Sequence, residues 1–156
     1  MYKTILVPHA GTPAGDKALE HAIHIAKISS SRIILLHVVE QIVHPPTFAL
    51  SSSERKSLFK SIDSANDSLK EDMKKEMEKR TEKYNKNHLE SEIIVSVGNA
   101  AEIILDTVKE KKIDLIVMAK RRKLKGVKKL LSLGSVSRKI VEHVRCPVVL
   151  VDIENL

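Results

Sequence analysis

The chain has 156 residues, of which 42% are hydrophobic and 30% charged, with a formal net charge of +7. This length supports one hydrophobic core, so we expect a single domain over residues 1–156. Its apolar runs are shorter than the roughly 20 residues of a membrane-spanning helix and than a signal-peptide core, and its one cysteine, Cys146, excludes a disulfide framework and a cysteine-rich zinc module. We therefore expect a cytoplasmic protein without a membrane partner.

The first predicted strand is the apolar run Ile5-Leu6-Val7. Thr12-Pro13 follows with an N-cap residue and a proline at the first helical position. Small or apolar residues then recur at helical spacing, at Ala18, Ala22, Ile25 and Ala26. The sequence therefore predicts a helix directly after the first strand.

The second predicted strand, Ile33 to Val39, leads into a long charged segment. Pro45-Pro46 marks a loop, and Ser51 with Glu54 has the spacing of a capping box, so we expect a long helix near residues 54–88. Its apolar residues form a narrow stripe: Leu58, Ile62, Ala65, Leu69, Met73 and Met77. We expect this stripe to pack on the sheet, and the alternative is that it recruits a partner protein.

The carboxyl half continues the alternation of strands and helices. The strands expected here are Ile93 to Val97, Leu115 to Met118 and Val148 to Val151. Asn99 with Glu102 predicts the start of a helix after the first of these strands, and Gly134-Ser135 opens another helix before the last.

All five apolar runs lack strict alternation, which is typical of strands buried on both faces, so we expect each at or near the centre of a sheet. The alternation of strands with helices predicts a doubly wound α/β fold. This fold has a five-stranded parallel sheet in the order 3-2-1-4-5, with helices on both faces. Ligands bind such sheets beyond the carboxyl ends of the strands, where the winding reverses. We therefore expect the loops after Val7 and Met118 to face each other across a crevice.

No standard catalytic motif is present. The sequence lacks a P-loop, a G-x-G-x-x-G turn, a G-x-S-x-G elbow and an H-E-x-x-H zinc pair. His21 and His24 lie three residues apart on the first predicted helix, but two histidines without a third ligand favour a solvated pair over a metal site. His9 and His37 are expected to be hydrogen-bonded structural histidines. We therefore predict no catalytic residue and no metal site.

Several short motifs occur in a fixed order along the chain. They are Tyr2 to Pro8, Gly11-Thr12, Leu35 to Val39, Asp114 to Met118, Leu133 to Ser137 and Cys146 to Val151. Their order and spacing resemble the universal stress protein family over nearly the whole chain, with residues 41–92 the least diagnostic. The resemblance implies a Rossmann-like domain of the adenine nucleotide alpha hydrolase type and a role in stress or starvation responses. It also implies homodimers that often form through the last strand, here Val148, Val149, Leu150 and Val151.

Many members of that family bind ATP through an acidic residue after the first strand and a G-x-x-G-x9-G-[ST] motif after the fourth. Glycines let backbone amides approach phosphate, and a helix N-terminus adds a favourable dipole. Gly134-Ser135 match the end of this motif, while Val38 and Met118 match positions that flank the base. The positions that the resemblance assigns to an adenine nucleotide, ATP or AMP, are Pro8, Ala10, Val38, Met118, Ala119, Arg122, Gly134, Ser135 and Val136.

Other positions depart from the family pattern. Ala119 and Arg122 replace the first two glycines, and Ala10 replaces the acidic residue. Eleven residues separate Arg122 from Gly134, two more than the motif has. An arginine in place of a glycine that packs against phosphate blocks the usual approach.

The positive charge is concentrated after the fourth predicted strand. Residues 120–145 hold ten Lys or Arg against one acid, a net charge of +9, whereas the rest of the chain sums to −2. The cations nearest the crevice, here called the basic loop, are Lys120, Arg121, Arg122, Lys123 and Lys125. They can replace glycine amides as phosphate ligands, and the alternative is a solvated basic arm.

The leading interpretation is a small cytosolic, homodimeric stress-response protein that acts by binding and not by catalysis, with adenine-nucleotide binding weakened, altered or lost. Its protein partner is unknown. The first alternative is ATP or AMP binding with residues 120–125 on the phosphates. The second is non-specific binding of nucleic acid or an acidic partner through residues 120–145.

The absence of aromatic residues in residues 120–145 disfavours nucleic acid, because base stacking then contributes nothing to binding. Slow nucleotide hydrolysis would need an acid to hold a metal near the phosphates, and Ala10 supplies none.

Overall fold

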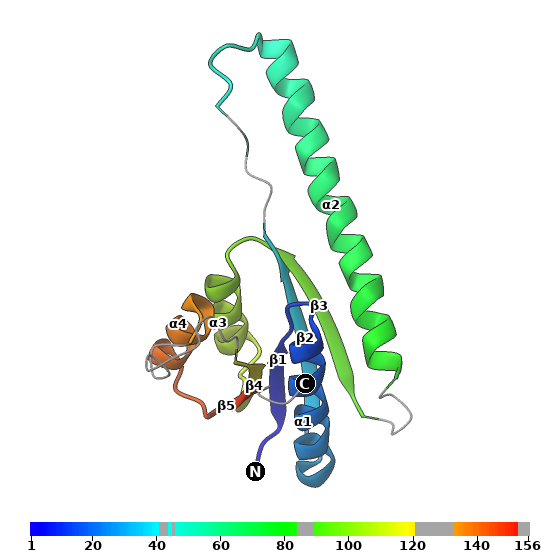
Figure 1. Cartoon of the computed structure of the whole chain (residues 1–156), viewed down its shortest axis with the longest axis vertical. Coiled ribbons are helices and arrows are strands. Elements are labelled where there is room, and N and C mark those ends of the chain that lie inside the picture. The colour runs from blue at the N-terminus through cyan, green and yellow to red at the C-terminus, as the bar shows by residue number, and fades with distance from the viewer. Residues whose placement is uncertain (41–43, 45, 84–88, 121–132, 153–156) are drawn as a thin grey trace.

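Strands and helices alternate along the chain, as their sequence patterns predict. The computed structural model describes residues 1–40, 44, 46–83, 89–120 and 133–152. In chain order the elements are β1 (Thr4–Pro8), α1 (Pro13–Ser29), β2 (Arg32–Val39), α2 (Ser52–Glu82), β3 (Ser91–Val97), α3 (Ala100–Glu110), β4 (Leu115–Ala119), α4 (Ser135–His143) and β5 (Val148–Val151). The strands form one parallel sheet in the order β3-β2-β1-β4-β5, which confirms the predicted doubly wound fold (Figure 1).

The helices begin where their capping residues predict. Thr12 caps α1, and Ser51 with Glu54 makes both hydrogen bonds of a capping box at α2. Asn99 caps α3. Each start is local in origin, because a side-chain oxygen accepts a hydrogen bond from an N–H group that the first helical turn leaves unpaired.

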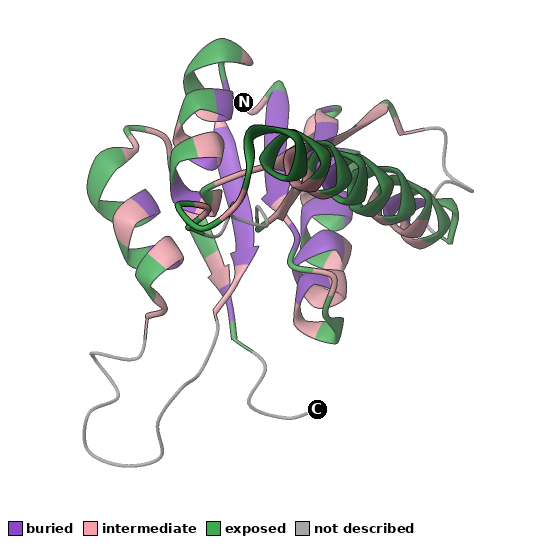
Figure 2. Cartoon of the chain, turned by 90° about the horizontal axis from the view of Figure 1, so that it is seen from above, coloured by how far each residue is buried: buried purple, intermediate pink, exposed green. Residues whose placement is uncertain are grey.

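Two apolar cores lie on opposite faces of the sheet. The core beneath α1 and the end of α2 includes Val7 and Leu35, and the core beneath α3 and α4 includes Leu6 and Leu36. Successive side chains of a strand point to opposite faces, so neighbours on β1 and β2 enter different cores. Figure 2 shows the resulting buried strands at the centre of the molecule.

β3 and β5 are edge strands, so the expectation that every strand is central or near-central is wrong for these two. Most of their residues are half-buried, whereas Ile5, Leu6 and Val7 on β1 are 0% exposed. An apolar run indicates that both faces of a strand are covered by other elements. Its position in the sheet depends on the hydrogen-bond partners along its two edges, which no local pattern encodes.

α2 extends far beyond the sheet, and most of its surface is exposed (Figures 1 and 2). Met77 is fully buried and Met73 packs on the same core, whereas Leu69 is 38% exposed and Ala65 is also exposed. The expectation that the whole apolar stripe packs on the sheet is therefore wrong for its amino-terminal part. A helix of 31 residues spans about 46 Å, roughly twice the length of the strand β3 beside it, so it passes beyond the edge of the sheet.

Asp114 joins the starts of β1 and β4. Its Oδ2 accepts hydrogen bonds from the backbone N–H groups of Lys3 and Thr4, both at 2.9 Å. The bonds from Lys3 and Thr4 lower the pKa of the Asp114 carboxyl below its usual value, because they favour the charged form. The carboxylate thereby links the starts of these two neighbouring strands.

Candidate functional site

The crevice is predicted at the carboxyl edge of the sheet, and β1 and β4 are neighbours there as expected. The strand ladder continues one residue past β1, since the His9 backbone N–H donates to the carbonyl of Leu36 at 2.8 Å. Side-chain alternation directs His9 toward α1 and α2 and leaves Ala10 exposed on the other side. Pro8 and Ala119, the last residues of β1 and β4, are half-buried. This wall of the crevice carries no acid where the family pattern has one.

Three of the predicted nucleotide positions belong to one apolar core. Met118 on β4 is part of the core beneath α3 and α4, and Val38 on β2 and Val136 on α4 pack against it. Val38 and Val136 are half-buried, and Met118 is 4% exposed. They lie at the carboxyl ends of their strands and at the first turn of α4, which is the side of the predicted crevice.

The N-terminus of α4 has no side-chain cap among the described residues. Gly134 is the N-cap residue, with φ −60° and ψ 157°, and no described side chain accepts a hydrogen bond from the first turn. A Cβ at Gly134 would meet no described atom within 4 Å, and Ser135 is exposed. The backbone therefore does not require glycine here. The N-terminal end of the helix dipole favours an anion at these first N–H groups.

Only one cation of the basic loop lies within the described residues. Lys120 follows β4 directly, its backbone N–H donates to the carbonyl of Val151 at 2.8 Å, and its Nζ lies 3.5 Å from Asp152 Oδ2. Its charge is thus partly shared with an acid at the end of β5. The predicted positions Arg121, Arg122, Lys123 and Lys125 lie outside the described residues.

A polar cluster that the sequence patterns did not predict lies on the other side of the same edge. His9 Nε2 is 3.1 Å from Asp16 Oδ1, and Arg80 Nη1 donates to Oδ1 and Oδ2 of Asp16 at 2.7 and 2.6 Å. Asp16 and Arg80 also line a shallow groove of about 250 Å³ between α1 and α2. The expected structural role of His9 and His37 is confirmed, because both are buried and His37 Nδ1 is 2.7 Å from the carbonyl oxygen of His9.

Burial and charge act together on this cluster. Burial lowers the pKa of His9 below 6.5, although the Asp16 charge opposes the shift. Burial alone would raise the pKa of Asp16, but the hydrogen bond and charge of Arg80, with a further contribution from His9, bring it below its usual value. The stable state is therefore a neutral imidazole beside an ionised Asp16–Arg80 pair.

The His9–Asp16 pair is not arranged for general base catalysis. The His9 side chain is 0% exposed, and its Nδ1 already accepts a hydrogen bond from Gly11 N–H at 3.0 Å. A general base must reach the proton that it removes. Within the described part of the chain, no three His, Cys, Asp or Glu side chains are grouped as metal ligands.

The last strand leaves one backbone edge without a strand partner among the described residues, since β5 pairs only with β4. Val149 is 36% exposed there, Val148 and Leu150 are half-buried, and Val151 is 8% exposed. Among the helices that the structure describes, none is both long enough and apolar enough to cross a membrane.

The parallel five-stranded sheet with helices on both faces is a Rossmann-like α/β domain. The model of the universal stress protein family matches residues 1–152, and the chain belongs to this family. Universal stress protein YxiE of Bacillus subtilis is 31% identical over 151 residues, which cover 97% of this chain and 99% of YxiE. The solved structure of hypothetical protein MJ0577 superposes with a TM-score of 0.78 at 26% identity, covering 100% and 99% of the two chains. The identification made from the sequence motifs is confirmed.

Two other solved structures of similar fold contain nucleotides. A universal stress protein in complex with cAMP has a TM-score of 0.61 at 17% identity, with 97% of each chain covered. A universal stress protein family protein from Arabidopsis thaliana with AMP bound has a TM-score of 0.57 at 20% identity, covering 96% of this chain and 91% of that one. These two comparisons show that the fold is similar.

Proposed function

We propose that this chain is a homodimeric stress-response protein that binds an adenine nucleotide at the carboxyl edge of its sheet, weakly and in an altered mode, and catalyses no reaction. The observation that carries the proposal is the N-terminus of α4, which has no side-chain cap among the described residues and whose first turn packs, through Val136, on the same apolar core as Val38 and Met118. An apolar surface can hold a base, while the first N–H groups of a helix bind phosphate. The AMP and cAMP of the two structural relatives are ligands of this kind.

The binding mode differs from that of the family pattern because the loop after β1 has no acidic residue at position 10. Ala10 offers a methyl group where many family members have a carboxylate. A hydrogen bond to a charged group contributes about 1.5–3 kcal/mol. We therefore expect affinity roughly 10- to 150-fold below that of a site with the acid.

A calorimetric titration with AMP and with ATP tests the site. Gly134→Asp places a negative charge and a hydrogen-bond acceptor at the N-terminus of α4. Gly134→Ala is its control, because a Cβ there meets no described atom within 4 Å and a methyl group accepts no hydrogen bond from the first turn. We expect saturable binding by the unaltered chain and by Gly134→Ala, and about tenfold or greater weakening in Gly134→Asp. The double variant Arg121→Ala/Arg122→Ala measures whether the basic loop contributes to phosphate binding. Absence of saturable binding, or equal affinities in the two Gly134 variants, would refute the site.

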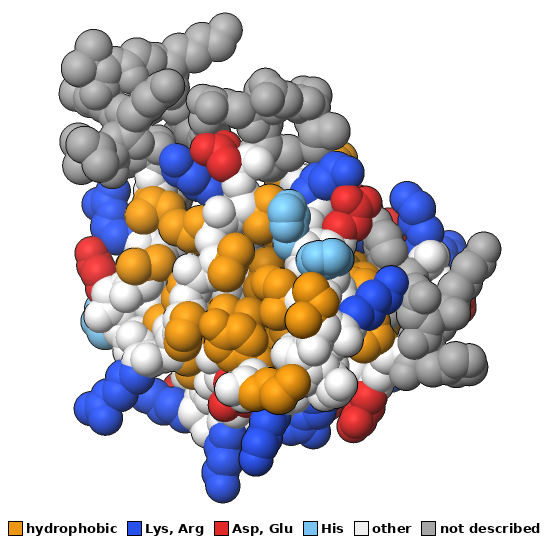
Figure 3. Space-filling view, turned by 90° about the horizontal axis from the view of Figure 1, so that it is seen from below, with side chains coloured by type: hydrophobic (Ala, Val, Ile, Leu, Met, Phe, Trp, Pro, Cys, Tyr) orange, Lys and Arg blue, Asp and Glu red, His pale blue; other side chains and the backbone are white. Residues whose placement is uncertain are grey.

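The homodimer is supported by the edge of β5, which has no strand partner within the described part of the chain, and by the apolar side chains of that strand. Hydrophobic side chains gather on the underside of the molecule, on which the N-terminus also lies (Figures 1 and 3). An unprotected apolar edge strand is otherwise an aggregation hazard, and pairing with a second copy removes it. Val149→Lys should convert the dimer to a monomer in sedimentation equilibrium. Val141→Lys, at a residue of α4 that is 42% exposed, should leave the dimer intact. A monomeric unaltered chain would contradict the proposal.

A further inference from the structure

Side chains bind both backbone polar groups of Gly11, in the loop that follows β1. The Gly11 N–H donates to His9 Nδ1 at 3.0 Å, and Arg80 Nη2 donates to the Gly11 carbonyl at 3.2 Å. Gly11 has φ +71°, a left-handed conformation that other residues rarely adopt. Ala10, at the wall of the crevice, is the residue just before it. The position of that wall thus depends on two side chains behind it.

These two side chains are joined through Asp16. Because His9 Nδ1 accepts a hydrogen bond, the ring proton is on Nε2, which donates to Asp16 Oδ1 at 3.1 Å. Arg80 binds both oxygens of Asp16 and is also paired with Glu76 at 3.0 Å. The result is a closed circuit of hydrogen bonds from β1 through α1 to α2 and back to Gly11.

We propose that His9, Asp16 and Arg80 are positioning residues that clamp the backbone of Gly11 beside the crevice, and that nucleotide binding is strongest when this clamp is closed. The inference rests on the proposed nucleotide function. Ala10 offers the ligand no polar side-chain atom, so this wall contributes to binding through the shape of its backbone. A loop held in its bound conformation before the ligand arrives pays less ordering entropy when the ligand binds.

The clamp closes only around a neutral His9. Asp16 from α1, Arg80 from α2 and His37 from β2 face its ring or backbone, and Glu76 acts through Arg80. A proton added at Nδ1 would turn the acceptor for Gly11 N–H into a second donor, and two N–H groups cannot share one hydrogen bond. Acidification therefore opens the clamp, at a pH below the ordinary pKa of histidine, because burial disfavours the charged ring.

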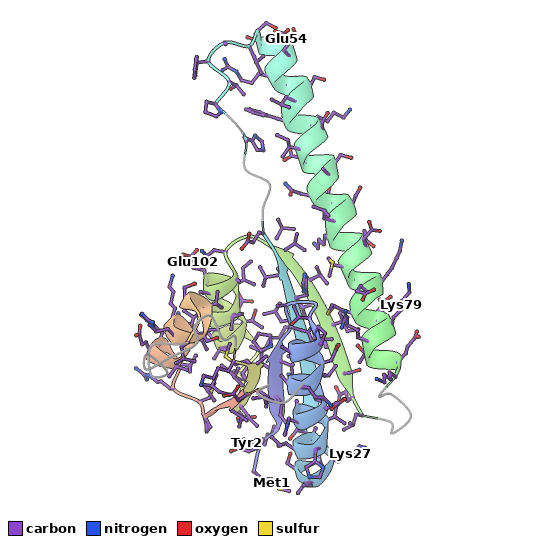
Figure 4. The ribbon with its side chains drawn as sticks, viewed as in Figure 1. Met1, Tyr2, Lys27, Glu54, Lys79 and Glu102 are labelled. Carbon is purple, nitrogen blue, oxygen red and sulfur yellow. The ribbon has the colours of Figure 1, made fainter. Side chains whose placement is uncertain are left out.

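A matched pair of variants separates the two ring nitrogens of His9. The amide oxygen of His9→Asn can occupy the place of Nδ1 and accept from Gly11 at any pH, whereas His9→Gln keeps a donor near the place of Nε2 and loses that acceptor. Both variants remove the ring and leave similar space, so general destabilisation is common to them. A second pair is Arg80→Lys, which keeps the charge but loses the planar fork, and Lys79→Met. Lys79 is an exposed residue of α2, labelled in Figure 4, that lines the same groove as Arg80 but makes none of the hydrogen bonds described above.

The readouts are AMP affinity by calorimetry at pH 5.5 and 7.5, and hydrogen exchange of the Gly11 amide by NMR. At pH 7.5 we expect His9→Gln and Arg80→Lys to bind AMP about five- to tenfold more weakly than His9→Asn and Lys79→Met respectively, the loss expected of one hydrogen bond. AMP affinity of the unaltered chain should fall more at pH 5.5 than that of His9→Asn. The titration of the AMP phosphate itself is common to both proteins and cancels in this comparison. The protection factor of the Gly11 amide, which is its intrinsic exchange rate divided by the observed rate at the same pH, should be lower at pH 5.5 than at pH 7.5, except in His9→Asn.

Each outcome decides one question. Equal AMP affinities within both pairs, with equal pH dependence, would overturn the positioning role even if all variants lose thermal stability. An unprotected Gly11 amide at pH 7.5 would overturn the clamp itself. If the unaltered chain binds no AMP while Gly11 protection still follows pH, the proposed nucleotide function and the positioning role both fail. The clamp is then confirmed only as a pH-dependent restraint on the loop.

Discussion

Gly15 should resist replacement by alanine even though it lies in a helix. Gly15 is buried in the first turn of α1, and a Cβ built on it would lie 2.7 Å from His9 Nε2 and 2.8 Å from two ring carbons. Atoms at such distances overlap, so either the ring or α1 must move. The His9 ring has little freedom, because its side chain is 0% exposed and both of its nitrogens are hydrogen-bonded.

Two opposing terms decide the sign of the change in the free energy of unfolding. Alanine is favoured over glycine within a helix by about 0.8–1 kcal/mol, and less in the first turn. Overpacking of a buried site costs about 1–3 kcal/mol. We expect the overlap to dominate, with Gly15→Ala destabilising the protein by about 1–2 kcal/mol, which lowers the Tm by roughly 2–8 °C for a chain of this size.

Denaturant titration and calorimetry of Gly15→Ala, alone and with His9→Ala, test this reasoning. Removal of the ring abolishes the overlap, so in the His9→Ala background Gly15→Ala should be neutral or stabilising. The sign reversal is the decisive result, because it isolates one contact in a double-mutant cycle. A rise in Tm on Gly15→Ala in the unaltered background would refute the argument.

Three further predictions concern stability. Folding lowers the pKa of His9 from 6.5. The neutral His9 ring therefore contributes its full stabilisation of the fold above pH 6.5, and this stabilisation is lost as the pH falls toward the folded-state pKa. The stability of the unaltered chain should therefore decrease on acidification by up to about 1.4 kcal/mol per pH unit, and His9→Asn should flatten this slope in denaturant titrations. Met77→Ala should cost about 2–5 kcal/mol in the same assay, because Met77 is fully buried. Leu69→Ala, at the exposed part of the same stripe, should cost less than about 1 kcal/mol, and similar losses at both sites would contradict the observed docking of α2. Asp114→Ala leaves two backbone N–H groups without their acceptor and should lower stability by about 1–3 kcal/mol at neutral pH. Because the folded-state pKa of Asp114 is depressed, the difference from the unaltered chain should shrink in strong acid, and a constant difference would argue against the hydrogen bonds as its cause.

Local sequence patterns were sufficient to predict the helices and strands, their order and the family. Strand runs such as Ile5-Leu6-Val7 and caps such as Thr12, Ser51 and Asn99 act within a few residues of chain, so their physics can be read locally. The strand order was predicted from a doubly wound sheet in which the winding reverses between the first and fourth strands. Part of the candidate site was also predictable, since Val38, Met118 and Gly134 lie at strand ends or helix starts that the same local patterns fix.

The tertiary structure alone decided which strands are edges, where α2 leaves the sheet, and how the loop after β1 is held. Arg80 is 64 residues from Asp16 in sequence, and its pattern indicated only a basic residue near the end of a helix. In the sequence, Gly15 is simply a residue that forms helices poorly. Its contact with the His9 ring becomes visible only in the folded structure. A hydrogen bond or a steric overlap depends on distances between atoms that the chain brings together only when it folds, so such contacts leave no periodic signal in the sequence.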